Sequence, residues 1–174
     1  ADEKTLEALI DWSAALLTPA ERRGFERLAV FPTSFDRAAA HAVVGHDDPG
    51  ADEWDTQDLL SALVDKSLVV VRPGTGAIRY RMLETIRQFG LNALGREAGA
   101  LEATRLAHRD HYLDRATELR SVDDEFRSFN WCDTEHENLV AAAETTIGRL
   151  PGDVEAGYRL ITALQFPWAV RARN

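Results

Sequence analysis

The chain has 174 residues, of which 45% are hydrophobic and 28% are charged, and its formal net charge is −9. This is enough for a folded core in one domain or two small ones, and the acidic excess disfavours non-specific attraction to a phosphate backbone. The single cysteine, Cys132, excludes an internal disulfide framework, and no apolar run reaches the 18 residues of a membrane span. We therefore expect a cytoplasmic protein that makes no contact with a membrane.

The first thirty residues predict two helices. Apolar residues recur at helical spacing over residues 5–17 and predict the first of them. Thr18 can cap the second helix, Pro19 suits its first position, and Glu21 can complete a capping box with Thr18. This helix is expected to bury an apolar face made of Phe25, Leu28 and Ala29.

A short helix, a loop and a longer helix follow. Asp36 is expected to begin the short helix, which Gly45 ends. The segment that follows is acidic and contains glycine and proline, so it predicts a surface loop. Residues 55–66 then predict a helix whose apolar stripe is made of Leu59, Leu60, Leu63 and Val64.

The pattern changes from helical to strand-like after this helix. Residues 67–71 form an almost continuous β-branched run, and Pro73 and Gly74 occupy the second and third positions of a predicted type II turn. On the return strand, apolar and other residues alternate, with Ile78, Tyr80 and Met82 on the predicted buried face. A helix, a β-hairpin and another helix form the core of a winged helix.

The rest of the chain predicts only helices. The first helix runs from the hairpin to about Gly99, and the second covers residues 101–119. Residues 121–128 are a charged connector and the expected boundary within the chain. A further helix includes Leu139, Ala143 and Ile147. Asp153 is expected to cap the last helix, which Pro167 should kink or end because it lacks an N–H donor.

Four segments occur in an order that is similar to one protein family: residues 59–71 (LLSALVDKSLVVV), 80–89 (YRMLETIRQF), 108–113 and 135–142 (EHENLVAA). They resemble the region after the NB-ARC-type ATPase core in bacterial transcriptional regulators of the STAND class, including LuxR-like and antibiotic-pathway (SARP-like) regulators. Residues 8–31 look like the entry of that region into its winged-helix domain. The resemblance covers nearly the whole chain.

The resemblance implies a mainly α fold, with a winged-helix domain at residues 1–100 and, at residues 101–174, antiparallel helices that begin a TPR-like array. It also implies two partners within the same protein, an upstream NB-ARC-type ATPase domain and downstream helical repeats, with DNA bound only by other domains. The expected function is to couple nucleotide state to effector output by protein–protein packing. Candidate interdomain contacts are Arg79, Arg81, Glu84 and Arg87.

Direct DNA binding by a transcription-factor module is the alternative function. The predicted helix over residues 55–66 would then enter the major groove and present basic or amide side chains to base edges. Its expected outward face carries Asp55, Asp58 and Asp65 instead, with Lys66 as the one base at its end. Carboxylates repel phosphate, so this pattern disfavours DNA reading by the helix.

Catalysis is not expected. A phosphate-binding P-loop requires a Gly-x-x-x-x-Gly-Lys-Ser/Thr run, which the chain lacks, so we expect no nucleotide hydrolysis and no cofactor. Residues 82–84 lie where related NB-ARC proteins resemble Met-His-Asp, whose His touches bound ADP. Leu83 replaces that histidine here and cannot donate a hydrogen bond to phosphate. The prediction for these residues is a buried helix start, with Glu84 favourable near the helix N-terminus.

Overall fold

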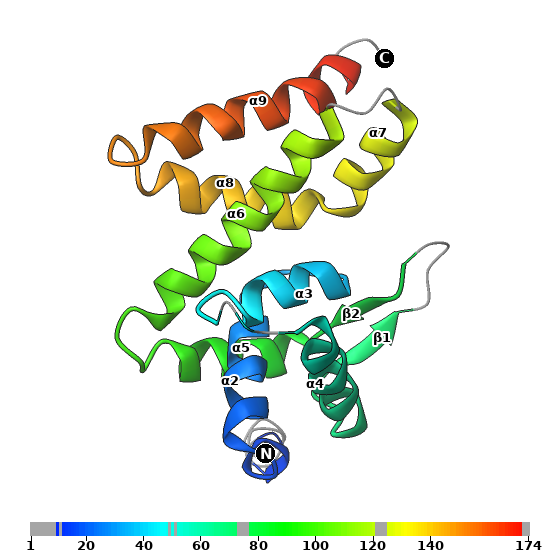
Figure 1. The fold of residues 1–174 in the computed structure, drawn as a ribbon, viewed down its shortest axis with the longest axis vertical. Helices are drawn as coiled ribbons and strands as arrows, with labels where there is room; N and C mark the ends of the chain where they lie inside the picture. The colour runs from blue at the N-terminus through cyan, green and yellow to red at the C-terminus, as the bar shows by residue number, and fades with distance from the viewer. Residues whose placement is uncertain are drawn as a thin grey trace. The chain divides into compact units, whose positions relative to one another are not determined.

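The computed structural model describes residues 10, 12–48, 50, 52–72, 77–120 and 125–171 (Figure 1). The chain divides into two compact units, residues 1–104 and residues 105–174, and the boundary falls inside a continuous helix, α6. The elements of the described residues are α2 (Pro19–Leu28), α3 (Arg37–Val44), α4 (Glu53–Asp65), β1 (Val70–Arg72), β2 (Arg79–Arg81), α5 (Glu84–Leu94), α6 (Ala100–Arg120), α7 (Glu125–Thr134), α8 (His136–Ile147) and α9 (Val154–Arg171).

Helix α2 begins where the sequence predicts. The Thr18 hydroxyl accepts a hydrogen bond from the Glu21 N–H at 3.2 Å, and the Glu21 carboxylate accepts one from the Thr18 N–H at 2.7 Å. This reciprocal pair satisfies two of the donors that every helix N-terminus leaves open. The predicted first helix lies partly outside the described residues, and within them Ile10 and residues 12–15 are helical.

The hairpin belongs to a slightly larger sheet than the sequence predicts. Strands β1 and β2 are antiparallel, with Val71 opposite Tyr80, and Phe35 adds an isolated bridge on the other side of Tyr80. The Phe35 and Tyr80 backbones exchange hydrogen bonds of 2.9 and 2.8 Å. This bridge fixes the loop before α3 to the hairpin, and within the loop Phe31 stacks on Phe35 with ring centroids 4.3 Å apart.

Three predictions about this region are wrong in detail. Strand β1 begins at Val70, because Ser67 has a φ of 59° and turns the chain before the strand. Ile78 is 61% exposed, although Tyr80 and Met82 are buried as expected. Helix α5 ends at Leu94, a turn earlier than the predicted end near Gly99. The predicted turn at Pro73 and Gly74 lies outside the described residues.

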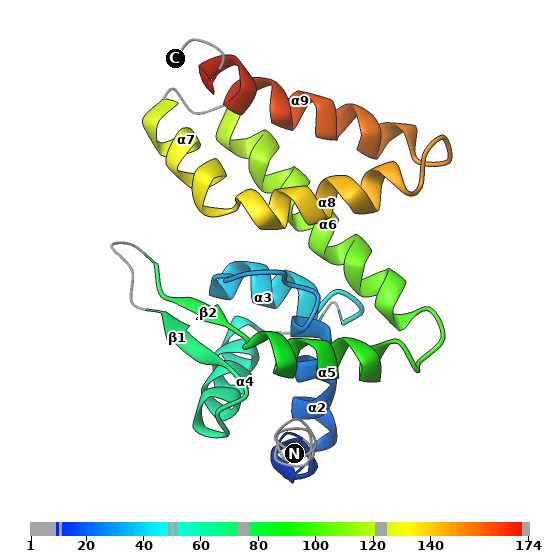
Figure 2. The same cartoon turned by 180° about the vertical axis from the view of Figure 1, so that it is seen from behind.

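Helix α5 crosses α2 closely, as Figure 2 shows. A Cβ added at Gly90 of α5 would lie 2.8 Å from the Ala29 Cβ, so the absence of a side chain permits this approach. Phe25 and Phe89 meet on the same side of the contact, with ring centroids 6.4 Å apart. This contact closes the core that also buries Leu28 and Ala29, as predicted.

The second unit consists of the remaining helices. Helix α8 begins at His136, and Asp153 caps α9 by accepting a hydrogen bond from the Ala156 N–H at 3.2 Å, as predicted. One prediction is wrong, because part of the charged connector is helix α7. Of the two effects expected of Pro167, it does not end α9, which continues to Arg171. Small residues such as Ala142, which is fully buried, let α8 and α9 pack.

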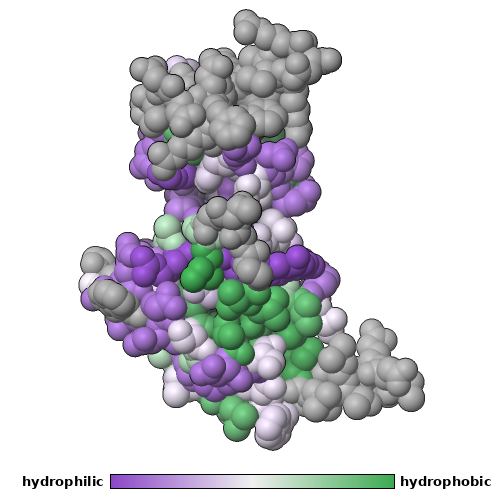
Figure 3. Space-filling model, turned by 90° about the vertical axis from the view of Figure 1, so that its right-hand side faces the viewer, coloured by the Kyte–Doolittle hydropathy of each residue, from purple (hydrophilic) through white to green (hydrophobic). Residues whose placement is uncertain are grey.

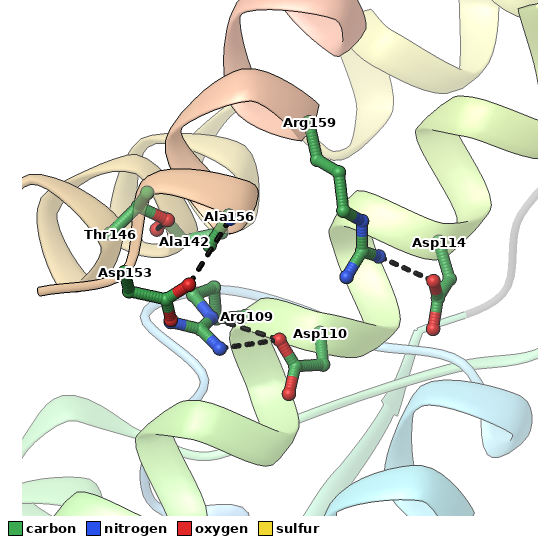
Figure 4. Close-up of polar contacts among 8 residues, drawn as sticks. All are labelled: Arg109, Asp110, Asp114, Ala142, Thr146, Asp153, Ala156 and Arg159. Atoms are coloured by element: carbon green, nitrogen blue, oxygen red, sulfur yellow. Dashed lines mark hydrogen bonds and ion pairs between the residues drawn. The ribbon is translucent and has the colours of Figure 1, made fainter.

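Polar side chains also hold this unit together (Figure 4). The Arg109 guanidinium, on α6, donates to the Asp153 carboxylate at 2.7 Å and to Asp110 at 2.9 Å. One turn further along the same helix, Asp114 accepts a hydrogen bond from Arg159 of α9. These contacts fix the N-terminal half of α9 against α6. Across the described residues, no helix is both long and apolar enough to cross a membrane.

Candidate functional site

Helix α4 occupies the position at which winged helices present a recognition helix to DNA. Leu60 and Leu63 are fully buried, and the Thr56 hydroxyl lies 3.0 Å from His41 Nδ1 on α3, so one face of α4 is fixed in the core. The opposite face is exposed and carries Asp55, Asp58, Ser61 and Asp65, whereas Glu53 pairs with Arg37 of α3. The prediction that this face presents carboxylates is therefore confirmed.

Lys66, directly after α4, makes an ion pair inside the domain. Its Nζ lies 3.0 Å from Glu21 Oε1, and both side chains are mostly buried. The Thr18 N–H and the Lys66 ammonium together hold the pKa of Glu21 below its usual value. Lys66 is therefore not an isolated base, and this pairing of residues 45 positions apart has no signal in the sequence.

The hairpin presents a mixed apolar and basic surface. Val71 is 46% exposed and Ile78 is 61% exposed, and Arg72 is exposed beside them. Figure 3 shows hydrophobic surface on the side where α4 and the hairpin lie. Arg79 folds back onto the loop before α3, where its Nε donates to the Ser34 hydroxyl at 2.9 Å and its Nη2 to the Ser34 carbonyl at 2.6 Å. Arg79 thus stabilises the domain internally.

The structure brings together two of the four predicted contact residues. Arg87 Nε and Nη2 each donate to the Glu84 carboxylate at 2.8 Å, and Nη1 lies 3.4 Å from the Ala29 carbonyl of α2. The Arg87 guanidinium, assisted by the charge of Arg81, lowers the pKa of Glu84. Because the Glu84 side chain remains 67% exposed, the pair offers its carboxylate at the surface.

Residues 82–84 are only partly as predicted. Met82 is buried and Glu84 lies in the first turn of α5, which agrees with the expected helix start. Leu83 is 53% exposed, because it occupies the N-cap position and its extended backbone turns the side chain outward. The exposed leucine adds to the apolar residues near the hairpin and, as an aliphatic side chain, offers no hydrogen bond.

Comparison with known proteins agrees with this architecture. Residues 17–94 match the model of the winged helix-turn-helix domain family, a range that begins just before the α2 cap and ends at the last residue of α5. Residues 17–94 therefore have a winged-helix fold. The remaining helices lie outside the match, and no solved structure matches the chain.

Mycobacterial proteins resemble the chain at greater length. A protein of Mycobacterium tuberculosis and one of Mycobacterium bovis, each named "Putative HTH-type transcriptional regulator", are 40% identical to it over 179 residues. The match covers 98% of this chain and 19% of each relative, so the chain spans about a fifth of their length. An uncharacterized protein of Mycobacterium tuberculosis is 40% identical over 109 residues, which cover 63% of this chain and 27% of that protein.

Proposed function

We propose that the chain is a winged-helix segment of a larger transcriptional regulator and acts by contacting other protein domains, without reading DNA through α4. The acidic face of α4 carries this proposal. Asp55, Asp58 and Asp65 are exposed at positions where a DNA-binding helix needs basic or amide side chains. The nearby Lys66 is already paired with Glu21. The names of the relatives support the regulatory part, and the winged-helix match supports the module.

We also propose which domains are the partners, on the basis of the family resemblance. An upstream NB-ARC-type ATPase domain and downstream helical repeats would flank the segment, which would transmit nucleotide state to effector domains by repacking, in the cytoplasm. The exposed apolar residues near the hairpin, Val71, Ile78 and Leu83, support a protein contact there. Arg81 and Glu84 lie on either side of Leu83 in the sequence and would give that contact its charge pattern.

A DNA titration tests the first part. The chain is mixed with a fluorescein-labelled duplex in about 50 mM salt, where phosphate contacts are strongest, and fluorescence anisotropy is recorded. We expect no binding by the native chain. An Asp55→Lys/Asp58→Lys variant should gain salt-sensitive binding, which shows that the assay would detect a basic α4. Tight binding by the native chain would refute the proposal.

Hydrogen exchange tests the interdomain part in the full-length protein. The amides of β1, β2 and the first turn of α5 should change protection between the ADP-bound and ATP-bound states, because a nucleotide-coupled contact must differ between them. A Val71→Glu/Ile78→Glu variant should abolish that difference. Identical exchange in both nucleotide states would contradict the coupling role.

Direct DNA binding through the hairpin remains the second candidate function. Two basic residues favour it, because Arg72 lies on β1 and Arg81 on β2 of the hairpin. The relatives are also named as helix-turn-helix regulators. Binding of this kind should weaken steeply with salt, and the slope should fall by about one for each phosphate contact that is removed. An Arg72→Gln/Arg81→Gln variant measures that slope.

A further inference from the structure

A groove of about 1210 Å³ lies within the first unit, between α2, the loop after α3, α4 and the start of α6. Four of its lining residues are buried: Gly24, Leu94, and two threonines, Thr56 and Thr104, whose hydroxyls interact with His41 and with the Ala100 carbonyl. The two long walls meet at Gly24, where an added Cβ would lie 2.4 Å from Leu59 Cδ2 of α4. The half-buried Val44, Leu59, Ala62 and Ala100 form an apolar floor.

The rim of the groove is strongly acidic. Eight carboxylates line it, against two arginines and one histidine, and one of the eight, Glu21, is already paired with Lys66; the acidic residues are Glu21, Glu26, Asp47, Asp48, Asp52, Asp55, Asp58 and Glu97. One of the two arginines is already neutralised, because Arg27 makes two hydrogen bonds to Asp47, at 2.6 and 2.7 Å, and a third to the Val44 carbonyl. Arg23 is the other. The groove therefore attracts cations.

Glu26 shows how this field acts inside the groove. Burial raises the pKa of the Glu26 carboxyl, and the nearby charge of Glu97 raises it further, although Arg22 and Arg96 oppose the shift. The charges of Arg22 and Arg96 therefore do not offset the cost of burying the Glu26 carboxylate. A cationic side chain placed in the groove would stabilise ionised Glu26 and Glu97 together.

The walls also restrict how a chain could bind. They consist mainly of helices, whose backbone groups are bonded within each helix, so no strand edge is available for an added β-strand. An apolar floor between helices suits the apolar face of another helix. A second copy of this chain is a poor occupant, because each copy carries a net charge of −9, and nucleic acid is repelled for the same reason.

We propose that this groove binds a basic amphipathic helix of a partner polypeptide, with its apolar side on the Leu59 floor and its Lys or Arg side chains on the acidic rim. The inference rests on the proposed function, because it gives a protein partner to the α4 surface that does not read DNA. It assigns the carboxylates of α4, Asp55 and Asp58, to partner recognition.

A designed peptide tests the inference. The probe is a labelled helical peptide of about 18 residues, long enough for five turns, with Leu on one face and Lys on the other. Two controls accompany it: a peptide of the same composition in scrambled order, and one with each Lys replaced by Glu. Anisotropy is measured at about 50 and 300 mM salt. The amphipathic basic peptide should bind at least about tenfold more tightly than either control.

Variants of the chain locate the site. Asp55→Asn/Asp58→Asn should weaken binding of the basic peptide about tenfold, because it removes two rim charges. The control, Glu137→Gln/Glu144→Gln, makes the same charge change at exposed positions on α8 and should leave the affinity unchanged. Amide chemical shifts should move in residues 20–27, 44–48, 55–62 and 94–104. Equal weakening by both variants, or equal binding of the scrambled peptide, would overturn the inference.

The groove and the proposed function can fail separately. If the peptide ignores Asp55→Asn/Asp58→Asn while the chain still does not bind DNA, the groove inference falls and the proposed function stands. If the native chain binds duplex DNA with a steep salt dependence, the proposed function falls. Competition by spermine alone, at the affinity of the peptide, would also overturn the inference, because it would show a site for charge without a helix.

Discussion

Lys66 Nζ lies 3.0 Å from Glu21 Oε1, and the other oxygen of the same carboxylate accepts the Thr18 N–H at the start of α2. The Glu21 side chain therefore caps α2 and also neutralises the positive charge of Lys66, which follows α4. Nothing near either residue in the sequence indicates this pairing. It couples the capping of α2 to the charge at the end of α4.

Replacing Glu21 should separate the two roles of this carboxylate. Glu21→Ala loses the capping box and the ion pair, and we expect it to lower the free energy of unfolding by about 1–2 kcal/mol. Glu21→Gln retains an oxygen for the Thr18 N–H and should cost about half as much. Urea titrations followed by circular dichroism compare the two. Glu144→Gln, at an exposed acid in the second half of α8, is the control.

Freeing Lys66 should not create a DNA-binding surface. In Glu21→Gln the lysine loses its partner, but Asp55, Asp58 and Asp65 remain on the exposed face of α4. The anisotropy of labelled duplex DNA should therefore stay unchanged. A clear gain in affinity would show that this single ion pair is what prevents DNA binding.

The contacts of Asp153 predict a graded effect in the second unit. Its carboxylate accepts hydrogen bonds from the Ala156 N–H and from Arg109, whose side chain is only 8% exposed. Asp153→Ala removes both interactions, whereas Asp153→Asn can still cap α9. Because a buried guanidinium that loses a partner is destabilising, we expect the alanine variant to lower Tm by about 3–6 °C. The asparagine variant should lower it less. Calorimetry measures both; equal Tm values would show that the cap contributes nothing.

The sequence predicts local features well and distant ones poorly. Thr18, Asp36 and Asp153 were identifiable as caps because a cap and the N–H that it accepts are about three residues apart. The carboxylates on the outer face of α4 follow from the same helical spacing. The Arg79–Ser34 contact joins residues 45 positions apart, and no periodicity can reveal it.

The sequence also does not predict which side chains are exposed just before a strand or helix begins. Ile78 fits the alternation of a half-buried strand, but the strand begins only at Arg79, so this side chain precedes the sheet and remains exposed. Leu83 precedes α5 and is exposed for a similar reason. The groove was missed because its lining comes from segments spread over residues 20–104. The acidic run after α3 was the one available signal, and it indicated only a surface loop.

His108 predicts a pH dependence of stability. Burial lowers the pKa of its imidazole to about 4, although a hydrogen bond with Asn138 partly opposes the shift. The unfolded chain, with a pKa near 6.5, binds this proton first, so stability is complete above about pH 6.5 and falls as the pH drops towards 4. The loss at this residue should reach about 3 kcal/mol.

The measurement is a set of urea titrations from pH 7 to pH 4.5. The carboxylates with lowered pKa values, such as Glu21 and Glu84, begin to destabilise the fold only as the unfolded chain protonates them near pH 4.5, so they add little to the slope above about pH 5. Glu26, whose pKa is raised, contributes with the opposite sign. The comparison with His108→Gln isolates the histidine, because the variant should be less stable at pH 7 and should lose most of the slope. A variant with the native slope would refute the assignment. His136→Gln, at an exposed position, is the control.

Two glycines of the first unit should respond in opposite ways to alanine. At Gly90 the added Cβ meets the Ala29 Cβ, 2.8 Å away, and a Cβ moves only with its backbone, so α5 must shift away from α2. We expect Gly90→Ala to lower the free energy of unfolding by about 1–3 kcal/mol. At Gly24 the close atom is Leu59 Cδ2, at the far end of a flexible side chain that lines the groove and has room to rotate. Alanine favours a helix by about 1 kcal/mol over glycine, so Gly24→Ala should be neutral or stabilising. Thermal and urea unfolding of both variants against the native chain test this contrast, and a destabilised Gly24→Ala would show that Leu59 cannot move into the groove.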